Sequence, residues 1–193
     1  MIMLSQQYEE SLYPLQDGVM SILSKCNTHF YLTGGTALSR GYYNHRYSDD
    51  LDFFVNNDPD YNAQVDEVLS NLKLSGLTWD SELDYIRSEH FVRVKAKAEK
   101  SAVSLKLDFV NDTAPHFGEI INTKVYNRTD SIRNILSNKI TALFRFEAKD
   151  VADIREIALH EHFDWTQAIR DARQKEAGVR PAHRIHIVST ACL

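Results

Sequence analysis

The sequence predicts an α+β fold in which a mixed β-sheet with flanking helices is followed by a helical C-terminal part. Two patterns carry this prediction. Apolar and polar residues alternate along residues 91–97 and 103–110, as in half-buried antiparallel strands. From residue 130 onward, apolar residues recur at helical spacing instead. With 193 residues, 43% of them hydrophobic, the chain is long enough for one domain or a close-packed pair of lobes.

The N-terminal part is predicted to mix helices and strands. Apolar residues at helical spacing indicate a helix over residues 5–26, with Pro14 and Gly18 weakening its early turns. A second helix, over residues 61–72, follows the turn-forming residues 56–59. Strands are predicted over residues 29–33, 50–55, 83–86, 91–97 and 103–110.

Three helices are predicted in the C-terminal part. Asp130 is the expected N-cap of the first, which carries apolar residues as far as Phe144. The second is expected over residues 149–160, and the third from residue 164 to residue 177, ending at Gly178. We therefore expect an α+β lobe with an N-terminal helix over residues 1–123 and a helical lobe packed against it over residues 124–193.

The charged residues are unevenly distributed between these two parts. Residues 1–123 contain 10 Lys and Arg against 18 Asp and Glu, whereas residues 124–193 contain 12 against 9. An acidic part suits carboxylates that hold a metal, and a basic part suits a polyanionic partner. A solvated helical surface accounts for the same split.

Other features indicate the compartment. Cys26 and Cys192 lie near opposite ends of the chain and show no metal-binding spacing, which favours a reducing compartment over a disulfide framework. The first residues do not resemble a signal peptide, and no stretch approaches the ~20 apolar residues of a membrane span. We expect a cytoplasmic protein with no membrane partner.

Asp50 and Asp52 are the first candidate site residues, because a strand places residues i and i+2 on one face. Two neighbouring negative charges need compensation by water or by a cation, and Mg²⁺ typically uses one or two carboxylates plus substrate phosphates. Asp108 lies in a similar apolar strand and is expected to join them. A solvent-exposed edge strand would explain an isolated pair of Asp residues without any metal.

A glycine pair precedes these acids by about fifteen residues. Gly34 and Gly35 lie between a predicted strand and a predicted helix, where backbone N–H groups can hold phosphate oxygens and the Thr36 hydroxyl adds a donor. A phosphate cradle beside three carboxylates on neighbouring strands is the equipment of two-metal phosphoryl or nucleotidyl transfer.

These motifs resemble those of a known family. Residues 34–38 read GGTAL and residues 45–52 read HRYSDDLD, which looks like the two-part signature of the AbiEii/AbiGii-type nucleotidyltransferases. These belong to the polymerase-β-like nucleotidyltransferase superfamily and act as toxins in type IV toxin–antitoxin and abortive-infection systems. The resemblance continues into residues 138–145 and 149–154, and covers roughly residues 28–177. It implies a nucleotidyltransferase-like sheet lobe followed by a helical lobe.

The resemblance also implies roles for individual residues. Asp50, Asp52 and Asp108 become the ligands of two Mg²⁺ ions, for which Mn²⁺ could substitute, and Lys139 and Asp150 join them in catalysis. Arg145 pairs with a phosphate or with Asp150, and Arg46 contacts phosphate or braces the Asp50 loop. The implied contacts to the NTP are Gly34, Gly35, Thr36, Arg46, Ser48, Lys139 and Arg145. Ordinary ion pairs on a helix surface explain Arg145, Lys149 and Asp153 equally well.

The activity implied is transfer of a nucleoside monophosphate from an NTP to a hydroxyl of tRNA or another RNA end. Growth inhibition would follow, relieved by an antitoxin encoded nearby, with no direct contact implied. Two alternatives stay open, namely a small-molecule nucleotidyltransferase of the aminoglycoside-modifying kind and an inactive nucleotide-binding module. The basic residues expected to contact RNA phosphates are Arg128, Arg133, Lys139, Arg145, Lys149 and Arg155.

Overall fold

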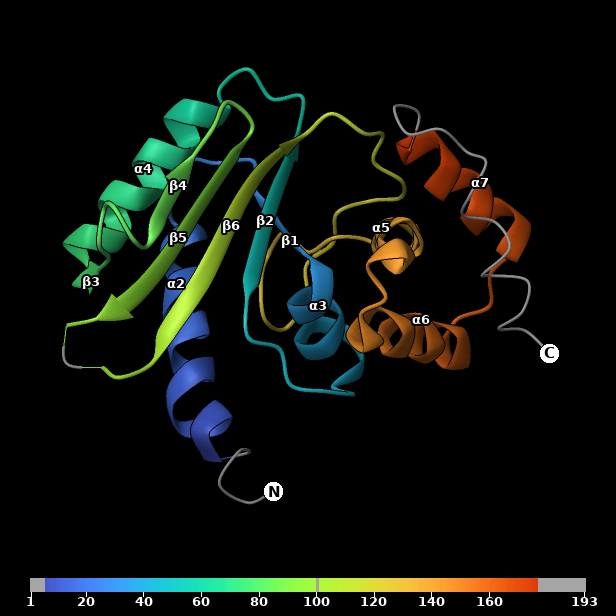
Figure 1. Cartoon of the computed structure of the whole chain (residues 1–193), viewed down its shortest axis with the longest axis horizontal. Helices are drawn as coiled ribbons and strands as arrows, with labels where there is room; N and C mark the ends of the chain where they lie inside the picture. Colours follow the sequence, from blue (N-terminus) through green and yellow to red (C-terminus); the bar gives the residue numbers. More distant parts are fainter. Residues whose placement is uncertain (1–5, 100, 177–193) are drawn as a thin grey trace. The chain divides into compact units, whose positions relative to one another are not determined.

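The computed structural model describes residues 6–99 and 101–176, which form two compact units (Figure 1). The first unit comprises the chain up to Thr113 together with Ile120–Asp130. The second comprises Ala114–Glu119 and the chain from Ser131 onward. The expected lobes, residues 1–123 and 124–193, stay a prediction, since a compact unit is not by itself an independently folding lobe.

A mixed sheet of six strands forms the centre of the first unit. Strand β2 runs parallel to β6, and the pairs β1–β2, β5–β6, β3–β5 and β4–β5 are antiparallel. The order across the sheet is β1-β2-β6-β5-β3, with β4 also pairing with β5. The strands are β1 (Tyr31–Thr33), β2 (Leu51–Asn56), β3 (Leu77–Thr78), β4 (Tyr85–Arg87), β5 (Phe91–Ala98) and β6 (Ser104–Asp112). The predicted α+β class is confirmed.

Helices of the first unit pack on one face of this sheet. The π-helical segment η1 (Tyr8–Leu12) continues into α2 (Tyr13–Leu23), and α4 (Tyr61–Leu74) contacts α2 (Figure 1). The short α3 (Gly34–Thr36) runs into the π-helical η2 (Ala37–Tyr43). Pro14 stands in the first turn of α2, a position where its missing N–H is tolerated.

Buried apolar residues alternate with more polar ones along much of β2 and β6, which forms the core on one face of the sheet and a polar surface on the other. Phe53 and Phe109, which are partners in the β2–β6 register, are fully buried and stack with ring centroids 5.7 Å apart. The hydroxyl of Tyr61 on α4 donates to the carbonyl oxygen of Phe109 at 2.8 Å. Because successive residues of a strand point to opposite faces, the residues before Phe53 and Phe109 point away from these helices.

The second unit is helical where it is described. Its elements are α5 (Ile132–Ala142), the 3₁₀ turn η3 (Leu143–Arg145), α6 (Ala148–His160) and α7 (Trp165–Lys175). Gly178, the expected end of the third helix, lies outside the described residues. Along residues 6–99 and 101–176, no helix combines the length and apolarity needed to cross a membrane.

The predicted N-cap of α5 is wrong. Ser131 caps the helix, and its hydroxyl accepts a hydrogen bond from the Asn134 backbone N–H at 3.0 Å. Asp130 is instead fully buried in the first unit, where its carboxylate accepts the Thr33 hydroxyl at 2.5 Å and its N–H donates to the Leu32 carbonyl at 2.8 Å. Asp130 therefore bonds to the end of β1 and does not cap α5.

Candidate active site

Two neighbouring strands of the first unit bring the predicted acidic residues together. In the parallel pairing of β2 and β6, Asp52 lies opposite Asp108. Partners in a register share a face, so both side chains lie on the face turned away from the aromatic core. Asp50 directly precedes β2. We call Asp50, Asp52 and Asp108 the acidic cluster.

Basic side chains compensate this cluster. The Lys106 ammonium lies 2.5 Å from Oδ2 of Asp50 and 4.0 Å from Oδ2 of Asp108. Arg93, opposite Asp108 in the β5–β6 register, donates from Nε and Nη2 to the two carboxylate oxygens, both at 2.7 Å. The pKa of Arg93 is raised chiefly by this hydrogen bond, against partial burial, and the charges of the whole cluster add to the rise.

The cluster offers the ligand chemistry that a divalent cation requires. Carboxylate oxygens are preferred by Mg²⁺, and Asp50 is 31% exposed with a partner on a flexible stem. Among the residues that the structure describes, no three His, Cys, Asp or Glu already form a metal-ligating group. The residues therefore fit a cation at Asp50 and Asp52, while a contribution from Asp108 requires Arg93 to release an oxygen.

The glycine pair lies directly against this cluster. Gly34 has a φ of +69°, and a Cβ atom added there would collide with the carboxylate of Asp52. A Cβ atom at Gly35 would collide with the guanidinium of Arg46 and lie 3.1 Å from Oγ of Ser48. Gly34 requires glycine because of its positive φ and its contact with Asp52, whereas a side chain at Gly35 would have to displace the mobile end of Arg46. We call Gly34 and Gly35 the glycine turn.

Two buried hydroxyls connect the glycine turn to the acidic cluster. Oγ1 of Thr36 donates to the carbonyl oxygen of Asp50 and lies 2.8 Å from Oγ of Ser48. Gln16 of α2 donates to the Ser48 carbonyl at 2.9 Å, and all three side chains are buried. In this arrangement Thr36 and Ser48 fix the backbone that presents Asp50.

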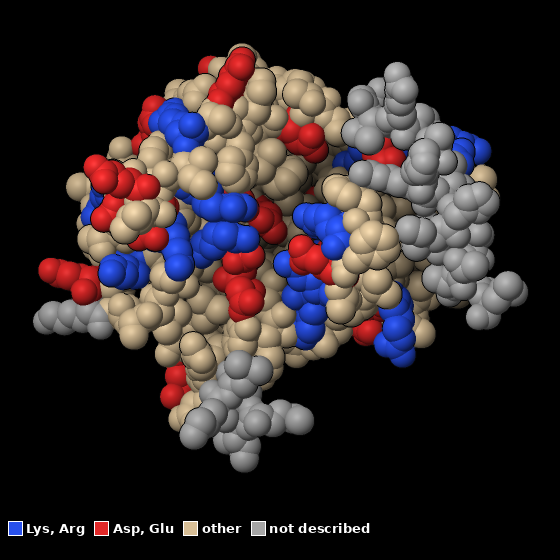
Figure 2. Space-filling view, viewed as in Figure 1, with Lys and Arg blue, Asp and Glu red and all other residues tan. Residues whose placement is uncertain are grey.

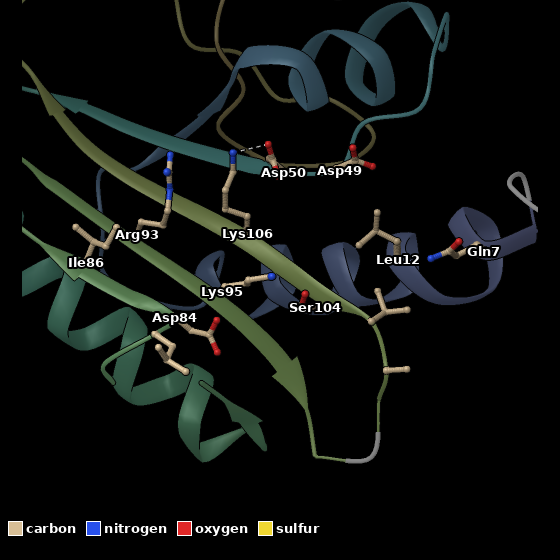
Figure 3. Close-up of a pocket in the computed structure, with 13 residues that line it drawn as sticks. Gln7, Leu12, Asp49, Asp50, Asp84, Ile86, Arg93, Lys95, Ser104 and Lys106 are labelled. Atoms are coloured by element: carbon tan, nitrogen blue, oxygen red, sulfur yellow. Dashed lines mark ion pairs between the residues drawn. The ribbon is translucent and has the colours of Figure 1, made fainter. Parts of the chain in front are cut away.

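A cavity of about 580 Å³ opens beside Asp50 over the last strands of the sheet (Figure 3). Lys106 reaches from β6 to Asp50, and Arg93 and Lys95 project from β5 (Figure 3). Figure 2 shows Lys and Arg side chains gathered beside Asp and Glu side chains over this part of the sheet. We call this cavity the β5–β6 cleft.

Lys139, Arg145 and Asp150, the remaining predicted site residues, belong to the second unit. Lys139 donates to Asp150 at 2.8 Å and lies 2.7 Å from the carboxylate of Asp153. Arg145 donates to the other oxygen of Asp150 at 2.9 Å. Asp150 and Asp153 are fully buried and Lys139 is 8% exposed, so the interpretation as a surface ion pair is wrong for Asp153. Arg145 and Lys149 are exposed and do form ion pairs near the surface.

The basic residues that were expected to contact RNA are paired with acidic or carbonyl groups of the same chain. Arg133 forms a two-pronged pair with the buried Asp171, with distances of 2.6 and 3.0 Å. Lys149 pairs with Glu147 at 3.0 Å, and Arg155 lies 3.9 Å from Glu156. Arg128 belongs to the first unit and donates to the His29 carbonyl oxygen at 2.9 Å. These pairings leave the helices with less free positive charge than the sequence count indicates.

Sequence reasoning missed the cations of the first unit. Lys106 stands two residues before Asp108, which places both on one face of a strand. Arg93 and Lys95 occupy the polar side of the alternating pattern in β5. The alternation therefore contained this signal, but the partner of each residue depends on a strand register that the sequence does not state.

Solved structures share this fold. JHP933 from Helicobacter pylori superimposes with a TM-score of 0.59 at 23% identity, covering 84% of this chain and 70% of that one. MenT4, a nucleotidyltransferase toxin from Mycobacterium tuberculosis H37Rv, has a TM-score of 0.57 at 18% identity, covering 83% and 62% of the respective chains. At identities below 25%, these superpositions show a common fold and nothing beyond it.

The family follows from the sequence itself. No curated protein matches the chain. The model of the AbiEii nucleotidyl transferase toxin family, of type IV toxin–antitoxin systems, matches residues 20–189, which is most of the chain. The resemblance seen in the glycine turn and the HRYSDDLD segment is thereby confirmed. The chain belongs to the AbiEii family of nucleotidyltransferase toxins.

Proposed function

We propose that this nucleotidyltransferase transfers a nucleoside monophosphate from an NTP to a hydroxyl at an RNA end, tRNA being the first candidate, in a metal-dependent reaction. The observation that carries the proposal is the register of β2 and β6, which sets Asp52 opposite Asp108 with Gly34 packed against Asp52. A carboxylate pair beside a backbone turn is the arrangement needed to position a triphosphate and its cation.

Asp50 and Asp52 would hold Mg²⁺, with Asp108 as the third ligand. Two ions are proposed, and Mn²⁺ would substitute. When bound, such ions stabilise charge on the entering and leaving oxygens of a phosphoryl transfer. Arg93 holds both carboxylate oxygens of Asp108, so Asp108 would become a ligand only after one of these hydrogen bonds is released.

The protein's own groups would orient the nucleotide. Backbone N–H groups of the glycine turn face the triphosphate, while Thr36 and Ser48 hold the Asp50 backbone in place. Arg46, whose guanidinium packs against Gly35, supplies positive charge there. The catalytic roles expected of Lys139, Arg145 and Asp150 stay predictions, and in the second unit both cations pair with Asp150.

The chemistry is a displacement at the α-phosphorus. The acceptor hydroxyl oxygen forms a bond to that phosphorus and its proton is released to water. The bond from the α-phosphorus to the oxygen bridging towards the β-phosphorus breaks, and pyrophosphate leaves. Modification of RNA would inhibit growth, and the family implies an antitoxin that relieves it, without implying contact between the two.

Incubation with each α-³²P-labelled NTP, Mg²⁺ and a cell lysate tests this proposal. The expected product is labelled RNA, formed only with a divalent cation present. A labelled small molecule would show the alternative acceptor class instead. Absence of any labelled product with every NTP would indicate an inactive nucleotide-binding module.

A further inference from the structure

The β5–β6 cleft lies across the acidic cluster from the glycine turn. In the order of the sheet, β1 and the turn that follows it stand on one side of β2, and β6 and β5 stand on the other. The cleft includes Asp50 and extends over β6 and β5 (Figure 3). The entering and leaving oxygens of a phosphoryl transfer lie roughly in line, on opposite sides of the phosphorus. If the triphosphate occupies the glycine turn, as the proposed function requires, the acceptor approaches through this cleft.

Two lysines occupy directly paired positions on the strands that line the cleft. Lys95 on β5 and Lys106 on β6 are direct partners in the antiparallel register, and both line the cavity. Like charges directly opposite each other on neighbouring strands destabilise a sheet. Because this lysine pair does not help the sheet to fold, we take it as an indication that an anionic ligand binds here.

The other charges of the cleft lining have contacts of their own. Lys106 is paired with Asp50, and Arg93 with Asp108. Asp49 accepts the hydroxyl of Tyr8, and Asp84 lies 3.4 Å from the Asp80 backbone N–H. Lys95, by contrast, is exposed and has no carboxylate within 4 Å in the described part of the chain. It is therefore the cation available to a ligand.

A metal bound to Asp50 would also release Lys106, so that two directly paired positions of the sheet would carry uncompensated ammonium groups. Leu83 and Ile86, which line the same cavity, are 84% and 54% exposed and offer apolar surface to a ribose or a base. A sugar–phosphate backbone combines these two chemistries, whereas a polycationic small molecule would meet the lysines unfavourably.

We propose that the β5–β6 cleft is the acceptor-strand subsite, in which Lys95, assisted by Lys106, binds a backbone phosphate of the RNA next to its reacting hydroxyl. Lys95 is a binding and positioning residue, since it lies outside the acidic cluster. The inference goes beyond the proposed function by assigning the acceptor to a specific surface of the first unit.

Charge reversal on β5 tests this inference with a matched control. Lys97 stands two residues after Lys95 on the same face of the same strand, is also exposed, and does not line the cleft. Lys95→Glu and Lys97→Glu therefore change the net charge equally. Both would be titrated against a fluorescently labelled tRNA by anisotropy at several salt concentrations, and against a fluorescent NTP analogue, with melting temperatures measured alongside.

Lys95→Glu should weaken tRNA binding at least about tenfold at low salt and leave NTP binding unchanged, while Lys97→Glu changes tRNA affinity less than about twofold. Lys95→Gln should lower the slope of log affinity against log salt by about one. Equal effects of the two reversals, or loss of NTP binding in Lys95→Glu, would overturn the inference. Efficient RNA labelling by the wild type alongside such a result would leave the proposed function intact, whereas wild-type protein that neither binds nor labels RNA would overturn both.

Discussion

The ammonium group of Lys106 lies 2.5 Å from Oδ2 of Asp50, in contact with a proposed metal ligand. Both side chains are about one-third exposed, so water and ions have access to the pair. A pair of this kind contributes little stability, on the order of 0–1 kcal/mol. Its consequence is competition, because a divalent cation at Asp50 must displace Lys106.

Replacement of this lysine should therefore tighten metal binding. Lys106→Met removes the competing charge but keeps most of the aliphatic stem, and we expect Mn²⁺ affinity without nucleotide to rise several-fold. Titration followed by electron paramagnetic resonance of free Mn²⁺ measures this directly. Lys97→Met is the control, and equal or weaker Mn²⁺ binding by Lys106→Met would contradict competition at Asp50.

The glycine turn should tolerate no side chain next to Asp52. Gly34→Ala would be strained by the φ of +69° and would also push against the Asp52 carboxylate. Gly76→Ala has a similar φ of +86° but meets nothing within 4 Å. Both variants should lose about 1 kcal/mol of stability from backbone strain. Only Gly34→Ala should lose transfer activity, by at least about tenfold, and equal activities would show that Asp52 need not lie against the turn.

The buried lysine of the second unit should be essential for stability. Lys139→Ala removes the ammonium that contacts both fully buried carboxylates, whereas Arg145 still contacts Asp150. Removing one partner of a buried ion pair lowers the free energy of unfolding by about 3–5 kcal/mol. Thermal unfolding measures the loss, and the double variant Lys139→Met/Asp153→Asn should recover part of it. A Lys139→Ala protein that melts like the wild type would refute this structural role.

The Arg133–Asp171 pair should make the stability of the protein depend on acid pH. The pKa of Asp171 is lowered chiefly by its hydrogen bond with Arg133, against the effect of burial, and Gln167 adds to the lowering. Because the folded-state pKa lies below the ordinary 3.8, this stabilisation is present above that pH and is lost as the pH falls through the folded value. Arg133→Met should lower the unfolding free energy at pH 7 by about 1–2 kcal/mol.

Urea titrations at several pH values test the direction of this effect. The stability difference between wild type and Arg133→Met should shrink as the pH falls below 3.8 and through the lower folded-state pKa of Asp171, because the carboxylate then becomes protonated in both proteins. Arg173, an exposed residue of the same helix, provides the control Arg173→Met. A difference that stays constant with pH would contradict the assignment.

Periodicity predicted much of the fold because the buried strands alternate strictly. β2, β5 and β6 were found within about two residues of their predicted ends, since their apolar faces form the core. β3 was missed because two residues, Leu77–Thr78, are too few to show a period. The cap of α5 was misplaced by one residue, because Asp130 and Ser131 have equal capping propensity and only tertiary pairing distinguishes them.

The candidate site could be predicted only in its local parts. Spacing alone placed Asp50 and Asp52 on one face, and the glycine turn was visible as a break between strand and helix. The parallel register that sets Asp52 opposite Asp108, and the register that sets Arg93 against it, link residues far apart in the sequence. The burial of Lys139 between two acids likewise depends on how α5 and α6 pack.

Transfer activity of Asp50→Asn and Asp52→Asn tests the central claim most directly. Each purified variant would be compared with the wild type for transfer from an α-³²P-labelled NTP to RNA with Mg²⁺, together with its melting temperature. We predict a loss of at least about 100-fold in each variant, the scale of removing one group that stabilises transition-state charge, with the fold retained. Full activity in either folded variant would contradict a metal-dependent reaction at the acidic cluster.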